Sequence, residues 1–335
     1  MSIVTHAYAR AGLVGNPSDG YNGKTISFVI RQYKATVTLT ESDRFEILPG
    51  SGDLTNFESV GAFLRDVRLN GYYGGMRLLK AIVKKFHDYA AKNNIKLPLD
   101  KNFTLKFETD IPRLVGMSGS SAIVCAAFKA MMQFYKVDVQ KPIIPNLILS
   151  AEKEELNISA GLQDRVIQTY EGLTYMDFDK KLFAERGYGD YVSLDPPKRP
   201  PLFVAFDPDR AEVSDVTHRN LRALYDQGDA TVVGAMTKYR ALTDRGRAAI
   251  MAGDWDELHR VTNENFDIRK TIMPIAPENQ RMIDTARGAG ASAKFAGSGG
   301  AICGVFHGEE QFQKLSAALK GIGCTTIKPN IFADN

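Results

Sequence analysis

Residues 112–122 read PRLVGMSGSSA and follow the strand-like stretch FTLKFETD (103–110). Gly116 and Gly119 permit backbone angles that other residues avoid, and the pattern predicts that a helix begins at the serines. A turn of this kind points backbone N–H groups outward at the positive end of a helix dipole, which favours an anion such as phosphate. Serine at such a position is more commonly the N-cap of a core helix, and the turn alone does not separate these two interpretations.

A second glycine-rich turn, KFAGSGGA (294–301), lies between two short apolar strands. Taken alone it predicts a tight hairpin, in which small residues let the backbone approach another group closely. Two such turns in one chain, each flanked by apolar strands, favour a cradle for a nucleotide. Neither turn is a Walker A loop, because no Gly-Lys-Ser/Thr follows the glycines.

Composition narrows the class of protein. The chain has 335 residues, of which 44% are hydrophobic and 24% charged, and 42 Lys and Arg balance 39 Asp and Glu to a net charge of +3. Such values are typical of a globular protein, and the absence of a basic run argues against nucleic-acid binding.

No apolar stretch approaches the ~20 residues of a membrane helix, and the N-terminus does not resemble a signal peptide, so we expect no membrane association and a cytoplasmic location.

The cysteines and histidines argue against metal or disulfide scaffolds. Cys125, Cys303 and Cys324 are far apart in the sequence, which is typical of reduced thiols in apolar surroundings. The five histidines show no HxxxH or HxH spacing, so a zinc site is not expected.

The order of the predicted elements indicates an α+β fold in two lobes. Strands are expected within 25–40 and at 103–110, 173–178, 202–206 and 324–328, and helices at 76–93, after residue 119, at about 143–158, in a long run ending near 288 and at 309–322. The proline-rich DPPKRPP (195–201) is the best candidate linker. We therefore expect an N-terminal lobe at 1–192 and a C-terminal lobe at 200–335, with the active site in the cleft between them.

The two turns resemble the glycine-rich motifs of the GHMP kinases, the family of galactokinase, homoserine kinase and mevalonate kinase. The middle motif of that family, Pro-x₃-Gly-Leu-x-Ser-Ser-Ala, is matched by Pro112, Gly116, Ser120, Ser121 and Ala122, with Met117 in place of Leu. Its C-terminal motif is matched by Lys294, Gly297, Gly299 and Gly300. The stretch ARAGLVGNPSDGY (9–21) is similar to the N-terminal motif of galactokinase through Arg10, Leu13, Gly15 and Asp19, whereas Asn16 and Pro17 replace its Glu-His pair. The hydroxyl pattern that is read on the sugar should therefore differ from that of galactose.

The resemblance implies a ribosomal S5 domain 2-like N-terminal lobe, a ferredoxin-like α/β sandwich as C-terminal lobe, and dependence on ATP and Mg²⁺. It assigns ATP binding to residues of the two turns: Arg113, Gly116, Met117, Ser118, Gly119, Ser120, Ser121, Gly297, Ser298 and Gly299. It also assigns Mg²⁺ to Ser121 and Glu152, a ligand set that suits an ion preferring few carboxylates. Without the resemblance, Glu152 would be read as part of a solvated helix face, and Glu154 and Glu155 are near enough to compete for the role.

The same resemblance assigns the catalytic residues. Asp164 in AGLQDR (160–165) corresponds to the family's general base, and Arg10 to the basic residue beside it, which would keep the aspartate ionised. Asn16, Asp19, Asp164 and Arg165 are the expected sugar-binding residues. Taken without the family, Asp164 and Arg165 would be read as a surface ion pair.

Several phrases resemble the glucuronokinase branch of the family, among them LVGNPSDGYNGKTIS, NGYYGGMRLLKAI and NFDIR. This implies an ATP-dependent sugar 1-kinase that converts D-glucuronate to 1-phospho-α-D-glucuronate and ADP. A buried uronate carboxylate needs a cation, and Arg165, Arg113 and Arg269 are the candidates. In GYYGG (71–75), the tyrosines either stack on a ligand or cap the following helix.

Three alternatives stay open at this point. The first is a kinase of the same fold for galacturonate, galactose, fucose or a heptose. The second is a catalytically silent sensor of sugar or nucleotide, and retention of Asp164, Arg10 and Glu152 argues against it. The third is an RNA-binding protein, which would need a basic patch. The expected partners are small molecules only, and the sequence leaves the oligomeric state open.

Overall fold

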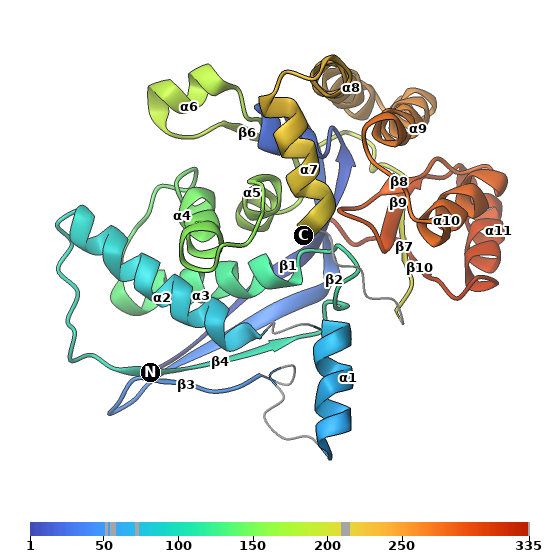
Figure 1. The fold of residues 1–335 in the computed structure, drawn as a ribbon. Coiled ribbons are helices and arrows are strands. Elements are labelled where there is room, and N and C mark those ends of the chain that lie inside the picture. Colours follow the sequence, from blue (N-terminus) through green and yellow to red (C-terminus); the bar gives the residue numbers. More distant parts are fainter. Residues whose placement is uncertain (51–52, 54–57, 71–73, 209–214, 334–335) are drawn as a thin grey trace.

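The computed structural model describes residues 1–50, 53, 58–70, 74–208 and 215–333. Within these ranges the chain forms two sheets and the helices that cover them, so the predicted α+β class is confirmed (Figure 1). Tyr72 and Tyr73, for which the sequence suggested stacking or capping, lie outside the described residues.

The first sheet is mixed, and its centre is one long strand. Its six strands are β1 (Ser2–Val14), β2 (Lys24–Glu41), β3 (Glu46–Ile47), β4 (Phe103–Thr109), β5 (Leu173–Asp177) and β6 (Asp190–Ser193). β2 pairs with β1 along one edge, and along the other its two halves pair with β5 and β4. All pairs are antiparallel except β3 with β4. The length of β2 follows from KTISFVIRQYKATVTLTE, which is rich in β-branched and aromatic residues.

The helices of this part of the chain are α1 (Val60–Asn70), α2 (Gly75–Lys92), α3 (Gly119–Tyr135), α4 (Ile144–Ser150), α5 (Gln163–Tyr170) and α6 (Lys180–Arg186). Of these, α3 and α5 pack directly on the sheet. α3, which is apolar almost throughout, packs on β1 and β2, and α2 packs on α3. The helix predicted at 143–158 is interrupted: α4 passes into a π-helical turn at Ala151–Glu155. Such turns are frequent at functional sites, and this one carries Glu152.

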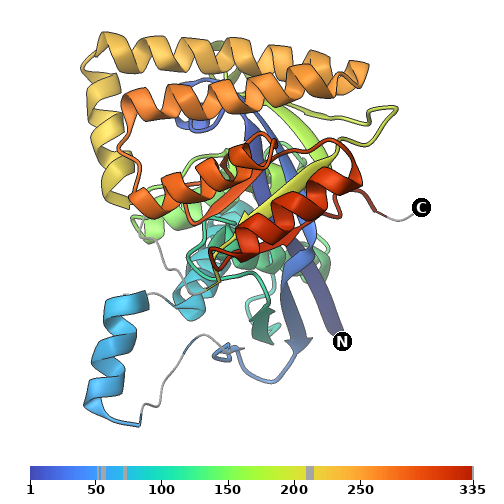
Figure 2. The ribbon, with the colours of Figure 1, turned by 90° about the vertical axis from the view of Figure 1, so that its right-hand side faces the viewer.

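The second sheet has strands from the last third of the chain. They are β7 (Leu202–Phe206), β8 (Lys294–Phe295), β9 (Ala301–Val305) and β10 (Thr325–Ile327), in the antiparallel order β10-β7-β9-β8. Its helices are α7 (Asp215–Asp226), α8 (Ala230–Ala252), α9 (Trp255–Ile272), α10 (Pro277–Gly288) and α11 (Gly308–Lys320). Figure 2 shows α8 and α9 side by side, with α7 crossing one end of the pair.

The predicted helical run up to residue 288 is four separate helices. Asp229 and Asp254 each cap a helix N-terminus through the side chain, and Gly253 ends α8 in the left-handed conformation. These local signals override the continuous apolar pattern. None of the helices that the structure describes is both long and apolar enough to cross a membrane.

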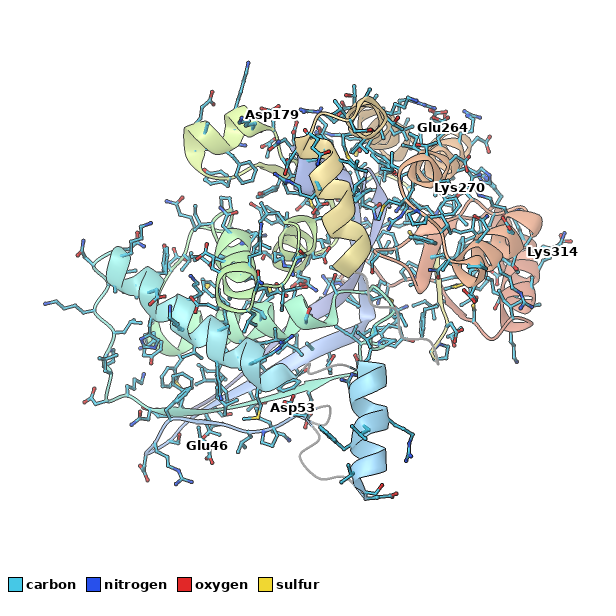
Figure 3. All side chains as sticks on the ribbon, in the orientation of Figure 1. Glu46, Asp53, Asp179, Glu264, Lys270 and Lys314 are labelled. Atoms are coloured by element: carbon cyan, nitrogen blue, oxygen red, sulfur yellow. The ribbon has the colours of Figure 1, made fainter. Side chains whose placement is uncertain are left out.

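One apolar core spans both sheets. The largest cluster joins residues of the first sheet, such as Leu39, with Leu202, Val204 and Cys303 of the second. Helix α8 also packs on β2, and Asp179 at the start of α6 forms an ion pair with Arg240 of α8 at 2.9 Å (Asp179 is labelled in Figure 3). The division into lobes at 1–192 and 200–335 stays a prediction, and the shared core argues that neither lobe is stable alone.

Candidate active site

The two glycine-rich turns touch each other. Gly116 has a φ of +74°, and an ideal Cβ placed on it would lie 2.6 Å from the carbonyl oxygen of Gly299. A Cβ on Gly297 would lie 2.3 Å from the carbonyl oxygen of Gly116. Real Cβ atoms do not approach backbone oxygens so closely, so this contact requires glycine on both sides. The second turn joins the antiparallel strands β8 and β9, so the predicted hairpin is confirmed, and its role as part of a nucleotide cradle stays a prediction.

A cavity of about 640 Å³ opens at this contact. Eight of the ten residues predicted to bind ATP line it: Arg113, Gly116, Met117, Ser118, Gly119, Ser120, Gly297 and Ser298. Ser121 and Gly299 are not among its lining residues. Gly74 and Gly75, at the start of α2, also line the cavity, and Asp53, which is labelled in Figure 3, accepts hydrogen bonds from the N–H groups of Gly50 and Gly75.

The serines of the first turn do not act as a simple helix cap. Ser118, at the N-cap position of α3, makes no capping hydrogen bond, and its Oγ donates instead to Oδ2 of Asp164 at 2.5 Å. Ser121 is fully buried, and its Oγ donates to the carbonyl oxygen of Ser118 at 3.2 Å. Ser120 lines the cavity. The structure therefore presents Ser120 to a ligand, where the sequence pointed to Ser121 as the metal-binding serine.

Asp164 and Arg10 form a bidentate ion pair. Nε of Arg10 donates to Oδ1 at 2.6 Å and Nη2 to Oδ2 at 2.8 Å. Nη1 of Arg10 donates to the carbonyl oxygens of Gly116 and Ala296, at 2.6 and 3.2 Å, and so joins the two turns. Burial alone would raise the pKa of Asp164, but the Arg10 guanidinium holds that pKa well below its usual range. Asp164 is therefore an ionised carboxylate on the cavity wall. The alternative ion pair with Arg165 does form, at 3.5 Å, but Arg165 is buried, so the pair does not lie on the surface.

Arg165 lines the cavity, as the sugar-binding prediction requires, but most of its N–H groups already have partners. Its Nε and Nη2 donate to Oε2 of Glu152 at 2.8 and 2.5 Å, and its Nη1 donates to the carbonyl oxygen of Gly161 at 3.0 Å. The side chain is 4% exposed, so the pair with Glu152 leaves little of the guanidinium for a substrate carboxylate. Its role as a sugar-binding residue stays a prediction.

Glu152 itself is fully buried, which excludes the solvated helix face. Burial raises its pKa although Arg165 opposes this effect. Its Oε1 has no hydrogen-bond partner among the described residues. The competing carboxylates pair elsewhere, Glu154 with Lys85 and Glu155 with Lys84. Of the three glutamates, Glu152 is therefore the one that is buried beside the site.

Asp19 and Asn16 belong to the sugar side of the predicted site, and both line the cavity. Asp19 packs against Gly161, where a Cβ would lie 2.0 Å from Oδ2, and it accepts a hydrogen bond from the N–H of Gln163 at 3.2 Å. Burial and the neighbouring charge of Asp164 raise the pKa of Asp19 to about 6. Asp19 therefore titrates close to neutral pH.

Lys294, the first residue of the C-terminal motif, is a structural lysine. It is buried, and its Nζ donates to the carbonyl oxygens of Gly12 and Phe295 at 2.5 and 2.7 Å. Burial lowers its pKa to about 7. Arg269, one of the candidates for the uronate carboxylate, donates to the carbonyl oxygens of Gly297 and Ser298. Both cations therefore hold the second turn in place.

Among the lining residues that the sequence did not assign to the cavity are three with long polar side chains: Gln163, Lys153 and Arg222. Gln163 has a local signal, because it directly precedes Asp164. Arg222 has none: it reaches the cavity from α7, about 200 residues away in sequence, and its Nη1 donates to the carbonyl oxygen of Gly20 at 3.0 Å.

A glycine-rich turn at a helix N-terminus, a part-buried Asp–Arg ion pair and a second glycine turn around one cavity are parts that suit phosphoryl transfer. Two family descriptions match the chain, GHMP kinases N terminal domain over residues 77–172 and GHMP kinases C terminal over residues 247–322. The chain belongs to the GHMP kinase family, so it is a phosphotransferase with an alcohol group as acceptor.

Two curated relatives come from Arabidopsis thaliana. Probable glucuronokinase 2 is 43% identical over 303 residues, which covers 88% of this chain and 82% of the relative. Glucuronokinase 1 is 40% identical over 332 residues, covering 97% and 91%. Among solved structures, phosphomevalonate kinase from Streptococcus pneumoniae superposes with a TM-score of 0.76 at 13% identity and covers 99% of this chain and all of that one. That structural likeness shows the fold alone.

Proposed function

We propose that the protein transfers the γ-phosphoryl group of ATP to the anomeric hydroxyl of D-glucuronate, giving 1-phospho-α-D-glucuronate and ADP. The observation that carries this proposal is the position of Asp164, which is ionised by Arg10 at the point where both glycine turns meet the cavity. The two Arabidopsis relatives, which are named glucuronokinases, support the choice of sugar.

The chain's own residues supply positioning and charge. The first turn of α3 offers backbone N–H groups and the Ser120 hydroxyl to the transferring phosphate. Asp164 accepts a hydrogen bond from the anomeric hydroxyl and so aims its oxygen at the phosphorus. Because Arg10 lowers the basicity of Asp164, the proton leaves late, as suits a loose transition state with little early demand on the base. An anomeric hydroxyl is more acidic than an ordinary alcohol, which suits this weak base.

The residues present fit a magnesium ion. Oε1 of Glu152 is a buried carboxylate oxygen without a partner among the described residues, and Ser120 adds a hydroxyl on the cavity wall. The described part of the chain has no cluster of three or more His, Cys, Asp or Glu that could hold a metal, so phosphate oxygens and water would complete the shell. A bound Mg²⁺ would neutralise charge on the phosphates during transfer.

For the uronate carboxylate we propose Arg222. Arg165 and Arg269 are committed to Glu152 and to the second turn, and Arg113 belongs to the phosphate turn. Arg222 lies near Asp19, since its Nη1 donates to the carbonyl oxygen of Gly20. Its Nε donates to Asp226 at 2.8 Å, and Nη2 has no hydrogen-bond partner among the described residues, so it is left for a ligand. A guanidinium can bind a carboxylate through two parallel hydrogen bonds, which a neutral hydroxymethyl group would leave unused.

The proposal is tested by measuring ADP release across a panel of uronates and neutral sugars, with ³¹P NMR of the product to locate the phosphate. We expect glucuronate to be preferred over glucose, galacturonate and galactose, with the phosphate on C1. Equal kcat/KM for glucuronate and glucose would remove the acid specificity but leave the kinase. Binding of sugar or ATP without any release of ADP would support the sensor alternative instead. We also propose a cytoplasmic location, which the three unpaired cysteines support.

A further inference from the structure

Two side-chain amides meet in the wall of the cavity. Asn16, from the loop after β1, and Gln163, the first residue of α5, are each 4% exposed and both line the cavity. A Cβ placed on Gly12 would lie 3.1 Å from Nδ2 of Asn16 and 3.1 Å from Nε2 of Gln163. Both amides therefore crowd the same point beside Gly12, although their residues are far apart in the sequence.

Neither side-chain amide has a hydrogen-bond partner among the residues that the structure describes. Oδ1 of Asn16 and Oε1 of Gln163 are buried without a partner, and neither side-chain amide makes a hydrogen bond to any other residue that the structure describes. Buried Gln168 differs in two ways: its Oε1 also has no partner, but its Nε2 donates to the carbonyl oxygens of Tyr8 and Ser118, and it does not line the cavity. Unpaired buried polar groups are rare in proteins, and a pair of them facing one cavity indicates a ligand that completes them.

The chemistry of the unpaired atoms selects the kind of group. The carbonyl oxygens need hydrogen-bond donors, which a carboxylate lacks and a hydroxyl supplies. The amide nitrogens need acceptors, which a hydroxyl also supplies. Rotating either amide by 180° exchanges its oxygen and nitrogen, but the oxygen still has no donor and the nitrogen still has no acceptor.

We propose that Asn16 and Gln163 form a paired amide subsite that binds ring hydroxyls of the sugar and determines which hydroxyl pattern is accepted. The pair lies beside the catalytic carboxylate, since Gln163 adjoins Asp164 in the chain and its N–H donates to Asp19. The acid group of the substrate is bound elsewhere. This inference rests on the proposed sugar kinase function but not on the identity of the sugar.

The test combines substrate analogues with variants. The sugar panel first identifies the best acceptor, and this step alone decides the proposed substrate. The 2-, 3- and 4-deoxy forms and the C6 carboxamide of that acceptor are then compared in the wild type, Asn16→Leu and Gln163→Leu. Gln133→Leu is the matched control, because Gln133 is an exposed glutamine at the far end of α3. ATP affinity and the unfolding midpoint report whether each variant is folded.

We expect at least one deoxy analogue to lose roughly 10–100-fold in kcat/KM with the wild type and the control, because it leaves a buried amide unpaired. The same analogue should lose less than about threefold with Gln163→Leu or Asn16→Leu, whereas the loss caused by the carboxamide should be the same in all proteins. Identical deoxy losses in wild type and variants, or variants that alter only the preference for the acid, would overturn the proposal. If a leucine variant does not fold, Gln163→Met keeps the length of the side chain but removes both the amide donor and the acceptor, and it should change the deoxy pattern in the same way.

Discussion

Replacing Asp19 by asparagine should stabilise the protein at alkaline pH and not at acid pH. Burial and the charge of Asp164 raise the pKa of Asp19 from 3.8 to about 6, against the weaker opposing effects of Arg10, Arg165 and the N–H of Gln163. Between these two values the folded state holds a proton that the unfolded state has lost, so stability falls as the pH rises from 4 to 6. Above pH 6 the ionised carboxylate costs about 3 kcal/mol.

Asparagine removes this cost, because it is neutral and its Oδ1 can still accept the hydrogen bond from Gln163. We therefore expect the unfolding free energy of Asp19→Asn to exceed that of the wild type by up to about 3 kcal/mol at pH 8, and the difference to vanish near pH 4. Urea unfolding followed by circular dichroism at both pH values measures it. Asp195, which is 86% exposed, supplies the control: its asparagine variant should differ by less than about 0.5 kcal/mol at either pH.

The same substitution should impair the reaction. If ionised Asp19 accepts hydrogen bonds from the sugar, kcat/KM of the wild type should rise with pH through about 6. The variant should not show this rise in kcat/KM, and it should bind the sugar more weakly. A variant that is stabilised equally at pH 4 and pH 8 would show that the gain has nothing to do with the charge. Destabilisation at pH 8 would refute the buried, charge-opposed environment altogether.

The remaining predictions concern other parts of the site and the fold. Asp164→Asn should lower kcat by roughly 10²–10⁴ while ATP affinity, measured by calorimetry, stays nearly unchanged; a fully active variant would remove the assigned base. Ser120→Ala should lower kcat/KM by roughly 10²-fold and Ser121→Ala by much less, as judged from kinetics over a range of Mg²⁺ concentrations, and the reverse order would restore the original assignment of Ser121. Arg222→Met should reduce the preference for glucuronate over glucose by roughly 10–100-fold with little change for glucose, and an unchanged ratio would place the carboxylate elsewhere. Residues 1–192 expressed alone should show no cooperative unfolding by calorimetry, because part of their core is supplied by the second sheet, and a sharp transition would contradict this.

The sequence predicts those parts of the molecule that are determined locally. The strand at 103–110, the turn at 112–122 and the helix that follows are found as β4, the cavity wall and α3, because alternation, glycine and apolar periodicity act over a few residues. The signals that divide the helical run up to residue 288 into four helices are also local in the sequence. They are the capping aspartates Asp229 and Asp254 and the glycine at 253, and the long apolar pattern obscured them.

The sequence does not show which site residues have partners that are distant in the chain. Arg165 pairs with Glu152, 13 residues earlier, and no local pattern around either residue indicates that pair. Arg222 was missed because α7 reaches the cavity only through tertiary packing. The sequence assigned no role to Gln163, because the neighbouring Asp164 is the more reactive residue. Its proposed role in binding the sugar rests on the absence of any partner for its amide in the described fold.

β1 explains why the three motifs work as one site. The N–H of Gly12 donates to the carbonyl oxygen of Ala296 at 2.7 Å, and the carbonyl of Gly12 accepts from Lys294, so the strand is fixed to the second glycine turn at one residue. Two residues earlier, Arg10 reaches both turns and Asp164. Four residues later, Asn16 completes the amide pair beside Gly12. A shift of β1 by one residue would turn every side chain to the other face, which would separate the base from its cation and the glycine turns from each other. The N-terminal motif therefore has to hold the phosphate cradle together as well as contact the sugar, so substitutions in it should lower ATP affinity and sugar affinity at once.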